Sequence, residues 1–309
     1  MDSRRVISRT NKRGAAIMMA LWALFLLSAM VISWALDIDT RLTVAGSANR
    51  SLEAIAMACS GAEVALHPGV KPGAGALRGT FPGNQSYEAR ISGEGGRLNI
   101  GKIVSAILAD PNSPFRELLR KYLEIKGVDL NDRDHMIDSL LDWVDPDNLV
   151  RTNGMEDDEG YKPPNGPLRS LDDLKRISGW KEFTERPDWD AELTLNTQNP
   201  GIDMNWASRD VLLSLPGVDE RLADRIMSAR RGPDDVEATE DDVQFAGAQD
   251  LVVLGFSPNL LNGLTGLITF NDPVVRIVSV GKSAGASRTV RMVVFKQGNG
   301  IRLISWKES

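Results

Sequence analysis

The sequence predicts an α+β fold in which one long amino-terminal helix packs on an antiparallel sheet, with a large helical domain inserted in the sheet. Three observations lead to this prediction. A long apolar run lies near the start of the chain, strand patterns occur near residue 90 and again after residue 270, and about 170 residues with helical patterns separate the two. The 309 residues are enough for one large domain or two ordinary ones.

The apolar run spans residues 15–36, and its only polar side chains are Ser28 and Ser33. A helix needs about 20 apolar residues to cross a bilayer. Five basic residues and one acid precede the run, whereas Asp37 and Asp39 follow it. The positive-inside rule therefore predicts a single membrane-spanning helix with a cytoplasmic N-terminus and residues 37–309 on the other side.

A secretory signal peptide is one alternative interpretation of this segment. Its apolar part would be about 7–15 residues long, with small residues at a cleavage site behind it. Here the apolar run is longer and is followed by Leu36-Asp37-Ile38-Asp39, which favours a segment that stays in the mature protein. A plain membrane anchor is the simplest hypothesis from hydropathy alone.

The helix is expected to continue beyond the apolar run. Residues 37–66 contain no proline and keep apolar residues at helical spacing until Pro68-Gly69. One helix over residues 15–67 would be about 80 Å long at about 1.5 Å per residue. Its outer half, residues 37–67, must lie against other parts of the protein. Cys59 lies in this half and is predicted to be a buried apolar residue.

Strand patterns define a sheet domain in two pieces, residues 68–100 and 267–309. Strands are expected at residues 86–91 and 96–100, and then at 274–280, 288–295 and 300–306. The inserted helical domain covers residues 101–266. Its helix starts are expected at capping residues, which are Ser113-Pro114, Asn131, Ser170, Asn205, Asp219 and Ser257-Pro258.

Composition and motif context argue against several function classes. The net charge of −6 argues against a nucleic-acid binder, and one cysteine with two histidines excludes thiolate or histidine-rich metal clusters. Gly281-Lys282-Ser283-Ala284-Gly285 matches a hydrolase nucleophile elbow, but a strand follows it and no histidine lies beyond His135. Leu213–Val218 resembles a DNA-binding helix–hairpin–helix element, yet Asp219 would face the phosphate. A non-enzymatic protein is therefore predicted, with a hydrolase as a remote alternative.

Acidic residues are concentrated in one stretch, because residues 129–159 hold 11 of the 42 acids. Asp138, Asp142 and Asp145 fall on one helical face, where like charges repel. A solvated surface is the simplest interpretation of this stretch and of a second acidic loop at residues 234–242. The alternative for the first stretch is a Ca²⁺ site, because Ca²⁺ prefers several oxygen ligands from flexible segments. The candidate inner ligands are Asp145, Asp147, Glu156 and Asp157, with Asp142 as an outer or alternative one.

The basic segment ends in Lys12-Arg13-Gly14-Ala15 at the edge of the apolar run. This resembles the type IV prepilin signal, in which a prepilin peptidase cuts after the glycine and the helix remains. The resemblance implies a leader at residues 1–14 and a processing site at Gly14 and Ala15. Pilins usually carry a glutamate five residues into the mature chain, where this sequence has Met19. General secretion pathway protein K, the large minor pseudopilin of type II secretion, also lacks that glutamate.

Further motifs resemble the protein K family over nearly the whole chain. They are Gly96-Arg97-Leu98-Asn99-Ile100, residues 138–147, Gly154-Met155-Glu156-Asp157, Tyr161, residues 165–168 and Leu195-Asn196-Thr197. The resemblance implies a type IV pilin-like fold and a structural subunit that caps the tip of the type II secretion pseudopilus and contributes to protein export. It also implies structural Ca²⁺ in the acidic stretch.

The partners implied by the resemblance are I- and J-type minor pseudopilins, the prepilin peptidase and the inner membrane, with no nucleic acid. The implied location is the inner membrane, with a periplasmic C-terminal domain, and then the pseudopilus tip. The alternative is a minor pilin-type subunit of a DNA-uptake or type IV pilus system.

Overall fold

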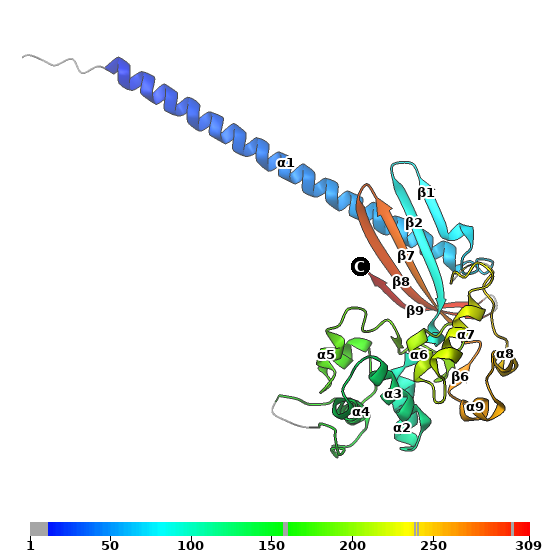
Figure 1. Cartoon of the computed structure of the whole chain (residues 1–309). Helices are drawn as coiled ribbons and strands as arrows, with labels where there is room; N and C mark the ends of the chain where they lie inside the picture. The colour runs from blue at the N-terminus through cyan, green and yellow to red at the C-terminus, as the bar shows by residue number, and fades with distance from the viewer. Residues whose placement is uncertain (1–11, 157–159, 238, 240, 298–299) are drawn as a thin grey trace, which may run out of the picture.

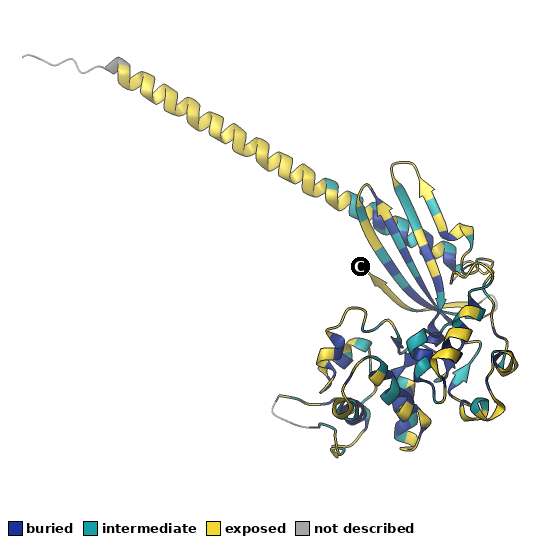
Figure 2. Ribbon diagram, viewed as in Figure 1, coloured by how far each residue is buried: buried dark blue, intermediate teal, exposed yellow. Residues whose placement is uncertain are grey.

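The computed structural model describes residues 12–156, 160–237, 239, 241–297 and 300–309. Helix α1 (Lys12–Leu66) is a single rod that projects from the rest of the molecule (Figure 1). Residues 14–45 of this helix are exposed. From Ala54 onward the helix is partly covered by the sheet (Figure 2). An 18-residue window of this helix has a mean hydropathy of 2.5, and the helix is long and apolar enough to cross a membrane.

The sheet has five antiparallel strands in the order β1-β2-β7-β8-β9. The chain leaves it after β2 and returns 180 residues later with β7. One face packs on the end of α1, which contacts β2, β7 and β8. This arrangement confirms the predicted α+β class. The strand bounds are Arg78–Phe81 (β1), Gln85–Gly93 (β2), Val274–Ser283 (β7), Ala286–Gln297 (β8) and Gly300–Glu308 (β9).

Small residues set the distance between α1 and the sheet. Ala54, Ala58, Ala62 and Ala65 are buried at a spacing that keeps them on one side of the helix. Opposite them, a Cβ added to Gly281 of β7 would lie 2.0 Å from the Ala54 carbonyl oxygen and 2.3 Å from the Ala58 nitrogen. The helix backbone therefore rests directly on the strand at this point.

The insertion folds into one helical domain beyond the end of α1 (Figure 1). Its largest buried side chains include Trp180, Tyr122 and Phe256. Trp180 also donates its indole N–H to the Met136 carbonyl oxygen at 2.9 Å, which fixes α4 against the following loop. The helices are α2 (Ile100–Ala109), α3 (Pro114–Ile125), α4 (Leu130–Val144), α5 (Lys181–Thr184), α6 (Arg209–Ser214), α7 (Glu220–Arg230), α8 (Ala248–Val253) and α9 (Pro258–Gly263), with 3₁₀ turns at Glu94–Gly96 and Leu171–Arg176. A further 3₁₀ turn, Gly75–Leu77, precedes β1.

Two short parallel pairs complete the inserted domain. Strand β3 (Leu98–Asn99) pairs with β4 (Leu193–Thr194), and β5 (Ile202–Asp203) pairs with β6 (Ile268–Thr269). The expected sheet strand at residues 96–100 is therefore wrong. Only residues 98–99 of this segment are extended. Asn99 is the N-cap of α2, because its side chain accepts a hydrogen bond from the Lys102 N–H. The fifth strand of the sheet is β1, in a segment where no strand was predicted.

Most expected helix starts are confirmed, with two displacements. Asp219 and Ser257 cap α7 and α9, and Ser170 forms a capping box with Asp173 on the 3₁₀ turn. The helix expected after Asn131 begins at Leu130. The helix expected from Asn205 instead begins behind Ser208, whose hydroxyl accepts from the Val211 N–H.

Candidate functional site

A buried ionic joint connects the inserted domain to the sheet. Glu94 is fully buried directly after β2, and Arg276 of β7 donates to both of its carboxylate oxygens at 2.7 Å. Thr194 and Arg97 donate to the same carboxylate from the inserted-domain side. Burial, together with the nearby Arg276, lowers the pKa of Arg97 to about 10. The bidentate pair fixes the point at which the chain leaves and re-enters the sheet.

Two further buried carboxylates lie where the chain returns to the sheet. Asp272 accepts from the Gln198 and Asn199 N–H groups, and Asp203 accepts from the Asp272 N–H at 2.9 Å. Burial raises the pKa of Asp203 to about 6, although two backbone N–H groups oppose this shift. These bonds satisfy backbone donors at the joint, so both carboxylates have a structural role.

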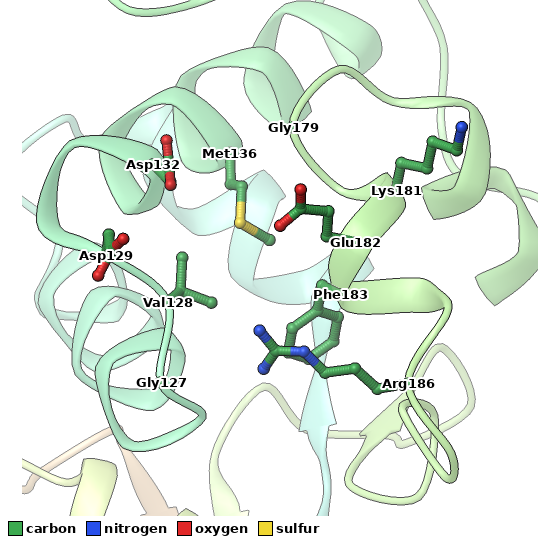
Figure 3. Close-up of a pocket in the computed structure, with 10 residues that line it drawn as sticks. All are labelled: Gly127, Val128, Asp129, Asp132, Met136, Gly179, Lys181, Glu182, Phe183 and Arg186. Atoms are coloured by element: carbon green, nitrogen blue, oxygen red, sulfur yellow. The ribbon is translucent and has the colours of Figure 1, made fainter.

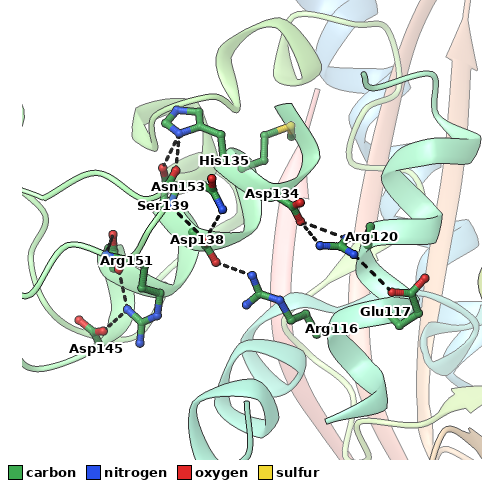
Figure 4. Close-up of polar contacts among 12 residues, drawn as sticks. Arg116, Glu117, Arg120, Asp134, His135, Asp138, Ser139, Asp145, Arg151 and Asn153 are labelled. Atoms are coloured by element: carbon green, nitrogen blue, oxygen red, sulfur yellow. Dashed lines mark hydrogen bonds and ion pairs between the residues drawn. The ribbon is translucent and has the colours of Figure 1, made fainter. Parts of the chain in front are cut away.

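The acidic stretch forms the end of α4 and the loop behind it (Figure 4). Asp142 and Asp145 are both buried, and Arg151 of the loop approaches both. Its Nη1 donates to Asp142 Oδ1 at 2.5 Å and also to Asp145 Oδ2. Gly154 permits this close approach, because a Cβ there would lie 1.8 Å from Asp142 Oδ2.

Asp138, one turn earlier on α4, has a different environment. Arg116 donates to its Oδ1 at 2.5 Å, and the Asn153 N–H and side-chain amide donate to its Oδ2 at 3.3 and 3.1 Å (Figure 4). Both of its oxygens are therefore occupied. His135 links the same loop to residue 178, with its ring nitrogens 2.6 Å from the Asn153 carbonyl oxygen and 3.0 Å from the Ser178 hydroxyl.

The predicted ligands Asp145 and Glu156 are incompletely satisfied. Each is 4 % exposed, and Asp145 Oδ1 and Glu156 Oε1 are buried without a hydrogen-bond partner among the described residues. Burial raises the pKa of both carboxyls, and for Glu156 the charges of Asp142 and Asp145 add to this effect. Unpaired buried carboxylate oxygens cost free energy, so this donor set fits a bound cation.

The other predicted site residues are more scattered. Asp147 is exposed, and its side chain accepts from the Leu149 N–H at 2.8 Å. Asp157 lies outside the described residues. Within the described part of the chain, no three His, Cys, Asp or Glu side chains are already grouped to hold a metal ion. Gly14 and Ala15 are exposed in the first turns of α1.

A pocket of about 360 Å³ lies between the start of α4 and α5 (Figure 3). Its floor is apolar, with Val128, Met136 and Phe183, and Asp129 and Glu182 lie at its rim. Among the described residues that line it there is no serine, cysteine or histidine. This lining offers no nucleophile–base pair of the kind that covalent catalysis requires.

Comparisons with known proteins find one family match, to part of the inserted domain, and one fold similarity over most of the chain. Residues 96–185 match a family described as type II secretion system (T2SS), protein K. In fold, the chain is similar to a chain in the crystal structure of the GspK-GspI-GspJ complex from the enterotoxigenic Escherichia coli type 2 secretion system. The TM-score is 0.57 at 11 % identity, over 88 % of this chain and 98 % of the other. No curated protein sequence matches the chain.

The fold is a long projecting apolar helix on an antiparallel sheet with a helical domain inserted in that sheet, and it is similar to the fold of that chain of the GspK-GspI-GspJ complex. Within this fold, residues 96–185 of the inserted domain match the type II secretion system protein K family. This confirms the resemblance inferred from the sequence. The ionic joint and the positions of Arg151, Arg116 and Asn153 were not predicted.

Proposed function

We propose that the chain is a structural subunit at the tip of the type II secretion pseudopilus and contributes to protein export across the outer membrane. The observation that carries this proposal is the combination of a protein K domain at residues 96–185 with a pilin-like helix and sheet in one chain. The partners proposed are I- and J-type minor pseudopilins, because the similar structure is a complex of GspK, GspI and GspJ. A DNA-uptake or type IV pilus subunit is not favoured.

Two features of the chain support a place at the tip. The inserted domain lies beyond the end of α1 that is remote from the apolar segment, where it would obstruct a further subunit stacked above it (Figure 1). Met19 lacks the charge with which a glutamate would pair with a neighbouring subunit's terminal amine. A subunit without that pairing is best tolerated at one end of a filament.

Co-assembly tests this function. The detergent-solubilised chain is expected to co-purify with I- and J-type pseudopilins as one complex, with few copies per filament. Immunogold labelling of sheared filaments measures its position and should mark one end. Labelling along the shaft, or no association with either partner, would contradict the tip assignment. A type IV pilin subunit of similar length is the matched negative control.

The proposed location is the inner membrane, with the amino terminus in the cytoplasm and the C-terminal domain in the periplasm. The charge asymmetry around residues 15–36 supports this orientation. Cleavage by a prepilin peptidase is expected between Gly14 and Ala15, which removes five bases and one acid and shifts the net charge from −6 to −10. Intact-mass measurement of the membrane form should give residues 15–309, and a start at any other residue would contradict the prepilin interpretation.

We also propose a structural Ca²⁺ site in the acidic loop. Asp145 and Glu156 would supply their unpaired oxygens, Asp142 would lie beside them, and Asp147 and Asp157 are the further predicted ligands. Ca²⁺ takes 6–8 oxygens and tolerates irregular geometry, which suits ligands drawn from a helix end and a loop. The bound ion would supply divalent charge that offsets the repulsion among these carboxylates.

Calcium is therefore expected to stabilise the chain. Binding to the folded form alone adds about 2.7 kcal/mol at a hundredfold excess over Kd. A thermal melt in calcium and in chelator measures this effect, and Asp145→Asn with Glu156→Gln should abolish it. Asp172→Asn is the matched control, because Asp172 lies on an exposed surface and pairs with Lys175. Equal melting temperatures of wild type in both conditions would leave the acidic loop without a metal.

A further inference from the structure

Arg151 occupies the position at which two proposed ligand carboxylates meet. A single nitrogen, Nη1, bonds to Asp142 in the last turn of α4 and to Asp145 at the C-cap of that helix. The Arg151 backbone N–H also donates to Asp142 Oδ2 at 3.3 Å. The main chain is thus fixed beside the carboxylates. The side chain is 31 % exposed and has a route to solvent.

The charges around Arg151 are only partly balanced. Asp142, Asp145 and Glu156 are three buried carboxylates, and within the described part of the chain Arg151 bonds to Asp142 and Asp145. The guanidinium does not satisfy all these oxygens, and Asp145 Oδ1 and Glu156 Oε1 have no donor among the described residues. The neighbouring Asp138 differs, because both of its oxygens are occupied.

We infer that Arg151 is the internal counter-ion of the acidic loop and competes with calcium for Asp142 and Asp145. This inference rests on the calcium site proposed above. Without metal, the guanidinium holds the two carboxylates together and keeps the loop closed. A divalent ion needs oxygens from the same carboxylates, and two cations at one position repel each other. Calcium therefore displaces the guanidinium toward solvent, and this displacement weakens the observed affinity.

The test uses the full chain in detergent micelles, with calcium chloride titrated into chelator-treated protein. Arg151→Gln is expected to melt at a lower temperature than wild type in chelator and to bind calcium at least tenfold more tightly. Arg116→Gln is the matched control, because Arg116 is similarly half-buried and pairs with Asp138 outside the shared position. Its Kd for calcium should stay within about threefold of the wild-type value.

A second measurement on the wild type remains informative if Arg151→Gln does not fold without metal. The ¹⁵N side-chain signal of Arg151, assigned by its loss in Arg151→Lys, should move toward the values of a solvent-exposed arginine when calcium is added. An unchanged signal during calcium binding overturns the competition.

The titrations separate this inference from the calcium site itself. If neither wild type nor Arg151→Gln binds calcium, the calcium site fails and the inference fails with it. If both bind and the affinity of Arg151→Gln is equal or weaker, the calcium site stands and the competition is overturned. An equal gain in Arg116→Gln also overturns it, because the effect would then reflect net charge and not the shared position.

Discussion

Arg276→Ala is expected to lower the free energy of unfolding by about 3–5 kcal/mol. The substitution leaves Glu94 fully buried without the two 2.7 Å bonds that it receives from Arg276. The remaining Arg97 contact at 3.2 Å comes from one nitrogen and cannot replace a bidentate pair. Chemical denaturation of the full chain in detergent, followed by tryptophan fluorescence, measures the loss.

An exposed arginine of the same sheet provides the control. Arg78 of β1 lies 3.7 Å from Glu88, and its side chain is 79 % exposed. Arg78→Ala should change the free energy of unfolding by no more than about 0.5 kcal/mol. Arg276→Met combined with Glu94→Leu should recover most of the loss, because it removes both buried charges. A loss below 1 kcal/mol for Arg276→Ala would show that the joint does not depend on this pair.

The long helix and the strands after residue 270 could be predicted because their patterns are local. Strand β1 could not, because its segment is rich in glycine and proline, which usually indicate a loop. The structure gives the reason for one of these glycines. A Cβ at Gly79 would lie 2.4 Å from the Tyr87 ring on the neighbouring strand. Strand β1 therefore needs glycine at this position, although a glycine there argues against a strand when only the sequence is read.

The sequence predicts which acidic residues form the candidate site, but it does not predict how their side chains are arranged. The count of acids between residues 129 and 159 indicated a strained electrostatic environment. Which oxygens would find donors depends on Arg151, Arg116 and Asn153, whose positions follow from how the loop folds back on α4. The Glu94–Arg276 pair joins residues 182 positions apart, and no local pattern relates them.

Gly281 determines how closely α1 lies on the sheet, and Gly281→Ala is expected to cost about 3 kcal/mol, near the upper end for overpacking. The added Cβ would meet backbone atoms of Ala54 and Ala58, which cannot rotate away as a side chain can. The helix must therefore move, which weakens the Ser283 hydroxyl bond to Glu53 at 2.6 Å. Gly75→Ala, with no atom within 4 Å of its Cβ, is the control and should be nearly neutral. Denaturation of both variants measures the difference, and equal stabilities would show that α1 can shift without loss.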